Sequence, residues 1–484
     1  MRTGGLLRNT LLYMPAQLFA PLLQFVVTVV WTHLFDPAVY GVVAFVVAAQ
    51  ELTGGLGLAW WSVYLLRFRQ QYADGARFAA MDARVVAGGV SSQIAFAVPT
   101  LALVGLAPSP GLFAATAAYL ASRAALNHYG EVARSNHRIG VYTLAQLSSP
   151  VLGSGLSIFA AIALKADAAT ALAAMAVGQT AGLALTSIGL RRPLRLGRFD
   201  GAIFREAWQF ALPLIFSGLF AWAASNGVRV LVGAGEGVAG VGLFSVGWGL
   251  GQRLAAMLAS LCAVASFPLA VDRLEAGDRD GALNQVSLNG ALMFGLMAPA
   301  TIGVALFAGP FVRLAVAQQF QAQTIVILPL AVVAGAARAL RVHTGDQTAL
   351  LVRRTRSMTV FNLIDAVAAL AGGAIGEHFG GVVGAAIGCL AGTLVGSTTA
   401  MTFVVARIGL RLPLNALAGI LVASAIMGAA LRFVAAPVGA VALAAQIVAG
   451  VLIYATMILL LFPQARRVAR RGFAFFAERR LSGP

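Results

Sequence analysis

The feature that most constrains this chain is its division into long apolar runs separated by short segments rich in arginine. Only 11% of its 484 residues are charged and 60% are hydrophobic, whereas a soluble domain has roughly 25% charged residues. An apolar run of about 20 residues crosses a bilayer as a helix. We therefore expect an all-α, polytopic membrane protein with fourteen transmembrane helices, over 10–33, 41–66, 85–106, 111–127, 141–164, 169–190, 206–228, 239–268, 287–308, 324–342, 357–377, 380–405, 415–434 and 438–462.

The positive charge of the chain predicts its orientation. A net charge of +17 in a soluble protein would suggest a nucleic-acid partner, but here the charges lie between the apolar runs, where arginines are retained on the cytoplasmic side. With the N-terminus inside, the inner segments hold 26 of the 34 basic residues. We expect a multi-pass protein of a bacterial inner membrane with both termini in the cytoplasm, membrane lipids as partners and no nucleic acid.

The two cysteines indicate neither a disulfide nor a metal site. Cys262 and Cys389 both lie within apolar runs, so neither a disulfide framework nor a Cys/His metal motif is available. We predict no metal and no cofactor.

The first twelve expected helices read as six helices repeated. The clearest match pairs Arg123-x4-His128-x-Gly130-Glu131 with Arg338-x4-His343-x-Gly345-Asp346, which is 215 positions later. Because six is even, the two copies have the same orientation and a pseudo-twofold axis along the membrane normal relates them. We expect an N-lobe over 1–200, a C-lobe over 201–412, an extra helix pair over 413–463 and a basic cytoplasmic tail over 464–484.

Two repeat-equivalent residues of opposite charge lie near the middle of their expected helices. Glu51 and Arg253 belong to the second and eighth runs, and a lone charge at this depth is costly unless it faces water or a partner. We expect Arg253 to bind an anionic head group in a central cavity while Glu51 pairs with it, or takes up a proton or a cation, in the empty state. A static structural ion pair is the alternative.

Further polar residues within the spans are candidates for the same cavity. Arg123, Arg338 and Arg341 could form a basic vestibule for an entering phosphate, or could extend to lipid head groups. Asn362 and Asp365 share a helix face and either line the cavity or bond between helices. The expected role of His128 and His343 is to cap helices rather than to relay protons, and that of Arg229 is to anchor a helix end.

Several short motifs resemble the polysaccharide biosynthesis family, the O-antigen and exopolysaccharide flippases of the multidrug/oligosaccharidyl-lipid/polysaccharide exporter (MOP) superfamily. The resembling stretches are Arg8-Asn9-Thr10 with Pro15, Leu34-Phe35-Asp36-Pro37 to Tyr40-Gly41, Ser225-Asn226 through Val241-Gly242-Leu243-Phe244-Ser245, Phe267-Pro268 with Gly277-Asp278, and Gly381-Val382-Val383-Gly384-Ala385-Ala386. The resemblance implies two six-helix lobes around a central cavity that carries cationic residues. It also implies an extra helix pair that helps to accommodate a lipid tail.

These observations together predict a flippase and no enzyme. The expected substrate is a polyprenyl-diphosphate-linked oligosaccharide, moved by alternating access for lipopolysaccharide or exopolysaccharide biosynthesis, with a polymerase and glycosyltransferases as further candidate partners. A drug or cation antiporter of the same superfamily is the first alternative. A membrane-embedded polysaccharide polymerase or glycosyltransferase is the second, and it would need a large outer loop with paired acidic residues.

Overall fold

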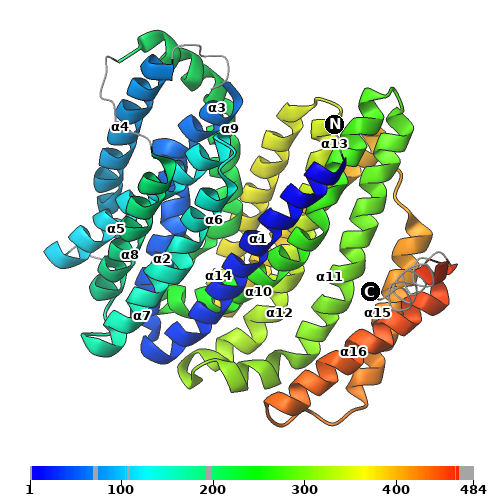
Figure 1. The fold of residues 1–484 in the computed structure, drawn as a ribbon. Helices are drawn as coiled ribbons and strands as arrows, with labels where there is room; N and C mark the ends of the chain where they lie inside the picture. The colour runs from blue at the N-terminus through cyan, green and yellow to red at the C-terminus, as the bar shows by residue number, and fades with distance from the viewer. Residues whose placement is uncertain are drawn as a thin grey trace, which may run out of the picture.

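The computed structural model describes residues 3–68, 75–103, 105, 109–191, 199–463 and 465–467, and the regular structure of these residues is helical throughout (Figure 1). The expected all-α class is thus confirmed. All but three residues of the predicted tail over 464–484 lie outside the described residues.

The first lobe is built from the helices up to α8. Asp36 caps α2 by accepting a hydrogen bond from Val39 N at 2.8 Å, and Pro37 occupies the first turn, where its missing N–H is not needed. The elements are α1 (Thr3–Leu34), α2 (Pro37–Gly54), η1 (Gly55–Ala59), α3 (Trp60–Phe68), α4 (Gly75–Ala102), α5 (Pro110–Ser135), α6 (Ile139–Ser148), η3 (Ser149–Gly153), α7 (Ser154–Ala163) and α8 (Ala168–Leu190).

The second lobe and the C-terminal helix pair are also built from helices only, among the described residues. The elements are α9 (Gly201–Asn226), α10 (Val228–Glu275), α11 (Arg279–Ala315), α12 (Gln318–Leu340), η4 (Arg341–Asp346), α13 (Gln347–Leu351), α14 (Thr355–Phe403), η5 (Val404–Ile408), α15 (Leu414–Arg432) and α16 (Ala440–Leu461). The last two helices pack against α11 at the edge of the molecule, outside the two lobes (Figure 1).

Length and apolarity alone do not reach the expected fourteen membrane-spanning helices, and that number stays a prediction. Among the described residues, ten helices are long and apolar enough to cross a bilayer, so the chain is a multi-pass membrane protein. Two of the ten contain a sharp reversal of the backbone, at Gly237 in α10 and at Gly380–Gly381 in α14. Gly237 and Gly381 have φ of 67° and 55°, which glycine adopts without the penalty that a Cβ brings. An element with such a reversal folds back on itself as two helical arms. A search by apolarity and length therefore counts its two arms as one helix.

The two lobes touch closely where α2 begins and where α10 continues after its reversal at Gly237. A Cβ on Gly41 would lie 2.0 Å from Val238 O, and one on Gly242 would lie 1.9 Å from Pro37 O, so the two backbones meet with no side chain between them. Beside this contact, Gln319 Nε2 donates to Phe35 O at 2.9 Å and ties the end of α1 to α12. We call this end of the bundle the closed side.

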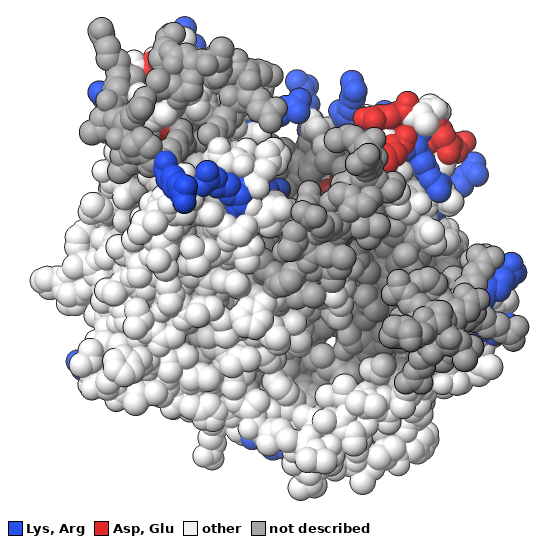
Figure 2. All heavy atoms as spheres, in the orientation of Figure 1, with Lys and Arg blue, Asp and Glu red and all other residues white. Residues whose placement is uncertain are grey.

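Basic residues gather at the opposite end of the molecule. On the face in Figure 2, Lys and Arg line the upper rim, near the N-terminus and the ends of α3 and α13, and the broad band below is almost free of charge. This distribution agrees with the positive-inside pattern of the sequence. We call this end the basic side.

Candidate functional site

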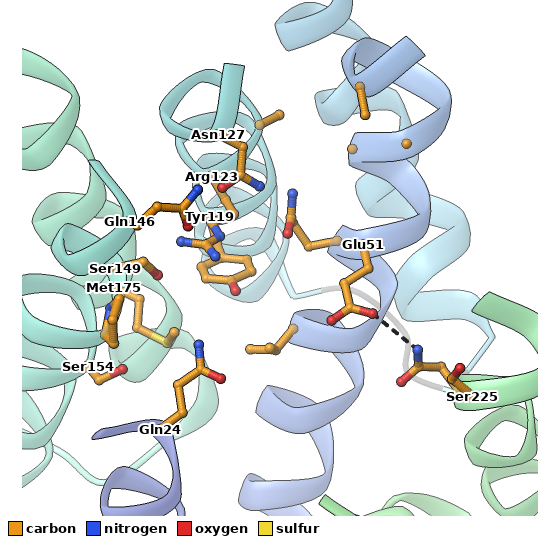
Figure 3. A pocket seen from close by; sticks show the side chains of 18 of the residues that line it. Gln24, Glu51, Tyr119, Arg123, Asn127, Gln146, Ser149, Ser154, Met175 and Ser225 are labelled. Atoms are coloured by element: carbon orange, nitrogen blue, oxygen red, sulfur yellow. Dashed lines mark hydrogen bonds between the residues drawn. The ribbon is translucent and has the colours of Figure 1, made fainter. Parts of the chain in front are cut away.

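A cavity of about 890 Å³ lies between the two lobes. It reaches the basic side through Leu66, Glu131 and Arg134, at the ends of α3 and α5, and Trp31 lines it toward the closed side. Side chains from α1, α2, α5, η3 and α9 point into it from several directions (Figure 3). The cavity therefore opens toward the basic side, whereas the closely packed glycines of the closed side, Gly41 and Gly242, do not line it.

The cavity wall is polar and carries a net positive charge. Its ionisable residues are Arg123, Arg134, Arg229 and Arg253 against Glu51 and Glu131, with His128 beside them. Arg134 Nη1 lies 3.4 Å from Glu131 Oε2 at the mouth. Three arginines therefore remain deeper in the cavity with a single carboxylate, Glu51.

The pairing expected between Glu51 and Arg253 is absent among the described ion pairs. Both residues line the cavity, but Glu51 Oε2 accepts from Asn226 Nδ2 at 3.2 Å (Figure 3), and Arg253 Nη1 donates to Thr28 Oγ1. Each side chain thus reaches across the interface to a neutral partner on the other lobe. The physical reason is that an amide and a hydroxyl group on the facing helices lie within hydrogen-bond reach and satisfy the two charged groups separately.

Arg229 belongs to the site, contrary to its expected role as an anchor at a helix end. It is buried, lines the cavity, donates from Nε to Ser245 Oγ at 3.1 Å and from Nη1 to Asn226 Oδ1. Asn226 therefore bridges Arg229 and Glu51. The sequence signal that was available is Ser225-Asn226 at the break between α9 and α10, because polar residues beside an arginine within an apolar run favour an internal location.

The repeat-equivalent arginines Arg123 and Arg338 have different surroundings. Arg123 lies on α5 and points into the cavity (Figure 3), and within the described part of the chain no hydrogen bond or ion pair of its guanidinium is found. Arg338 is enclosed in the C-lobe. Its Nε donates to Asp365 Oδ2 at 3.0 Å, and its Nη2 donates to Ala224 O at 3.1 Å and Thr393 Oγ1 at 3.0 Å.

The other two predicted residues of the C-lobe join the same buried network. Arg341 Nη2 lies 3.5 Å from Asp365 Oδ2 and donates to Asn362 Oδ1 at 2.9 Å, and Asn362 donates to Ser217 Oγ at 3.0 Å. Asp365 is fully buried. Arg338, Arg341, Asn362 and Asp365 do not line the cavity, so the vestibule expected from Arg123 and Arg338 together does not form.

The composition of the two repeats explains this asymmetry. The first half of α14 supplies Asp365 to Arg338, whereas its counterpart in the N-lobe, the segment 139–163, contains no Asp or Glu. That segment instead supplies Ser149, which accepts from Gln179 Nε2 at 3.2 Å, while Gln179 Oε1 accepts from Ser122 Oγ at 2.8 Å. The N-lobe therefore has a neutral hydrogen-bond network where the C-lobe has a charged one. The guanidinium of Arg123 has no described carboxylate partner and lines the cavity.

A second hollow of about 880 Å³ lies on the closed side, where α10 and α14 reverse direction. Glu236, Glu377 and His378 line it together with Gln323. In the sequence, nothing links Glu236 to Glu377. They lie 141 positions apart in the chain, and only the two helix reversals bring them together.

Comparisons with known proteins agree on the architecture. Residues 111–324 match the family model described as polysaccharide biosynthesis protein, and no curated protein matches the sequence. A structure of the lipid II flippase MurJ in an inward closed conformation is 13% identical, with a TM-score of 0.76, over 94% of this chain and 99% of that chain. An inward-facing MATE multidrug transporter of the MOP superfamily is 17% identical, with a TM-score of 0.60, over 80% of this chain and 94% of that chain. The chain has the MOP fold.

The resemblance that the sequence motifs suggested is thereby confirmed. The MOP structures also include an outward-facing MATE transporter, to which this chain is less similar, with a TM-score of 0.52 at 17% identity over 84% of this chain and 95% of that chain. The MOP structures that share the fold are transporters and flippases rather than enzymes.

Proposed function

We propose that the protein flips a polyprenyl-diphosphate-linked oligosaccharide from the cytoplasmic to the outer leaflet of a bacterial inner membrane by alternating access, for surface polysaccharide biosynthesis. The observation that carries the proposal is the unpaired guanidinium of Arg123 in a polar cavity that opens toward the basic side. A diphosphate cannot cross hydrocarbon alone, and a guanidinium binds phosphate oxygens through charge-assisted, bidentate hydrogen bonds.

The lining of the cavity suits a sugar beside the diphosphate. Asn127, Gln146 and Ser154 present amide and hydroxyl groups to the space around Arg123 (Figure 3). Such donors favour a ligand rich in oxygen atoms.

The proposal includes the topology predicted from the sequence. Dividing α10 and α14 at their glycine reversals, and counting α1 and α5, turns the ten apolar helices into fourteen crossings with both termini in the cytoplasm. The open mouth then faces the leaflet in which lipid-linked sugars are assembled. The apolar chain of the substrate would stay in the lipid while only its head group enters the cavity.

A drug or cation antiporter is the second candidate, because MATE transporters share the fold. A cationic drug would need acidic groups in the cavity, whereas this cavity has four arginines and two glutamates. Acceleration of the export of a cationic dye by the purified protein would favour this alternative.

The test is a flipping assay in proteoliposomes with a fluorescent polyprenyl-diphosphate disaccharide. We expect Arg123→Ala to slow flipping at least about tenfold, because a hydrogen bond to a charged group contributes about 1.5–3 kcal/mol and 1.4 kcal/mol is a factor of ten. The matched control is Arg313→Ala. Arg313 lies in the last turn of α11, outside the cavity, and we expect the rate to stay within about twofold, as for a surface substitution. Absence of flipping by the wild-type protein would contradict the proposal.

A further inference from the structure

A buried Ser–His–Asp constellation lies in the cavity wall of the N-lobe, away from Arg123. His128 on α5 is 2% exposed, and its Nδ1 lies 2.9 Å from Ser62 Oγ on α3. Its Nε2 lies 3.0 Å from Asp82 Oδ1 on α4, although the two are not aligned as a hydrogen bond. Trp61 Nε1 donates to the same Asp82 oxygen at 2.7 Å. Ser62 and His128 both line the cavity.

This arrangement satisfies Nδ1 of His128 in both of its protonation states. When the imidazole is neutral with its proton on Nε2, the Ser62 hydroxyl donates to Nδ1. When the imidazole is charged, Nδ1–H donates to Ser62 Oγ, and the hydroxyl can then donate to Leu58 O, which is 3.4 Å away. Asp82 faces Nε2 in either state. A buried histidine that serves only as packing has no need for an acceptor that can reverse its role.

The charges around His128 leave Asp82 as its dominant partner. Among the helices that pack against α5, neither α6 nor α8 contains a charged residue, α2 contributes Glu51, and α3 contributes Arg67. The described side chains of α4 add Asp82 and Arg84, and α5 itself has Arg123, Glu131 and Arg134. Among the described ion pairs, the partner of the imidazole is the carboxylate of Asp82.

The constellation is attached to a π-helical turn within the continuous helical segment from α2 to α3. Leu58 belongs to η1, the π-helical turn that joins α2 to α3, and π-turns inside helices frequently mark functional sites. Gly57 of the same turn packs against α4, since a Cβ there would lie 2.4 Å from Gln93 Nε2. On the other side of η1, α2 carries Glu51 in the cavity and Gly41 on the closed side. A change in the Ser62–Leu58 bond therefore acts at the turn that joins the cavity wall to the closed contact.

We propose that His128, with Asp82 and Ser62, is the site where a proton binds and drives the conformational cycle. The coupling ion would be H⁺, which enters from the cavity and reorganises the turn η1 between α2 and α3. This inference rests on the proposed transport function and adds the coupling ion to it.

The first test follows initial flipping rates in proteoliposomes between about pH 5 and 8, the range in which histidine changes charge. Coupling between two ligands typically amounts to about 5- to 150-fold, so we expect the wild-type rate to change at least about fivefold across this range. His128→Gln keeps a hydrogen-bonding side chain but cannot be charged, and its profile should be flat. Asp82→Asn keeps an acceptor for Trp61 and should flatten the profile as well.

The matched control is His343→Gln, which replaces the repeat-equivalent histidine of the C-lobe. The described contacts of His343 include Gln347 Nε2 at 3.5 Å and no carboxylate, so its replacement should leave the pH profile unchanged. A flat wild-type profile, or a steep profile that survives in His128→Gln, would overturn the proton site.

A second measurement needs neither substrate nor variants. Because Trp61 bonds to Asp82, the tryptophan fluorescence of the purified wild-type protein should show a transition between about pH 5 and 8. If this transition occurs but no lipid-linked sugar is flipped, the transport proposal fails and the proton site stands. If flipping occurs without a fluorescence transition or a pH profile, the proton site alone fails.

Discussion

Replacing Gly242 with alanine should open the closed side of the cavity. The added Cβ would lie 1.9 Å from Pro37 O and 3.1 Å from Gly41 N, whereas non-bonded heavy atoms prefer separations of about 3.5–4.0 Å. The start of α2 and the segment of α10 that follows Gly237 must therefore move apart by on the order of 1.5 Å. Overpacking costs about 1–3 kcal/mol, and it penalises only the conformation in which these helices touch. The ratio of closed to open conformations should fall about 5- to 150-fold, since each 1.4 kcal/mol is a factor of ten.

Labelling of a cysteine inside the cavity would measure this shift. Ala256 lines the cavity and is exposed to it, so Ala256→Cys, with Cys262 and Cys389 replaced by serine, reports on access by a membrane-impermeant maleimide. With the reagent on the closed side, labelling should be slow in this background and at least about fivefold faster after Gly242→Ala is added. Gly155→Ala is the matched control, because a Cβ there has nothing within 4 Å. Unchanged access in a folded Gly242→Ala protein would refute the assignment of this contact as the seal.

Three further substitutions test the packing described above, each by thermal unfolding of the purified protein. Arg338→Ala leaves Asp365 buried beside Arg341 alone and should lower the free energy of unfolding by about 3–5 kcal/mol. Exchanging both Arg338 and Asp365 for apolar residues should restore much of that stability. Equal losses in the single and double variants would contradict the ion-pair argument. Gly376→Ala places a Cβ 2.0 Å from Gly384 O in the α14 hairpin and should cost about 1–3 kcal/mol, whereas an unchanged melting temperature would show that the hairpin arms are not in contact. Asp36→Ala removes the cap of α2 and should cost about 1 kcal/mol, a loss that Asp36→Asn should largely avoid.

The helical class and the location of the charges follow from the sequence because both depend on local physics. Apolar length predicts a spanning helix, and arginine position predicts a side of the membrane. The expected helices also break at both backbone reversals, between 228 and 239 around Gly237 and between 377 and 380 before Gly381. The composition signal there is local, because Glu236 and the pair Glu377–His378 interrupt the apolar sequence beside these glycines.

The site was predictable in its residue types but not in its pairings. Arg123, Glu51 and Arg253 line the cavity, as their depth in apolar runs suggested. The repeat placed Arg338 equivalent to Arg123, yet equivalence in sequence does not supply equivalent neighbours. The carboxylate that pairs with Arg338 is that of Asp365 in α14. A single sequence does not reveal which helix will face that arginine.

The network around Arg338 has a consequence for how the molecule moves. The guanidinium of Arg338 donates hydrogen bonds to Ala224 in α9, to Asp365 in the first arm of α14 and to Thr393 in the second arm. It therefore cross-links these three segments to α12. We expect a bundle cross-linked in this way to move as a rigid body, and the N-lobe, which has neutral hydrogen bonds at the corresponding place, to deform more readily. The C-lobe would then act as a fixed frame, and the N-lobe would be the part that changes shape during transport.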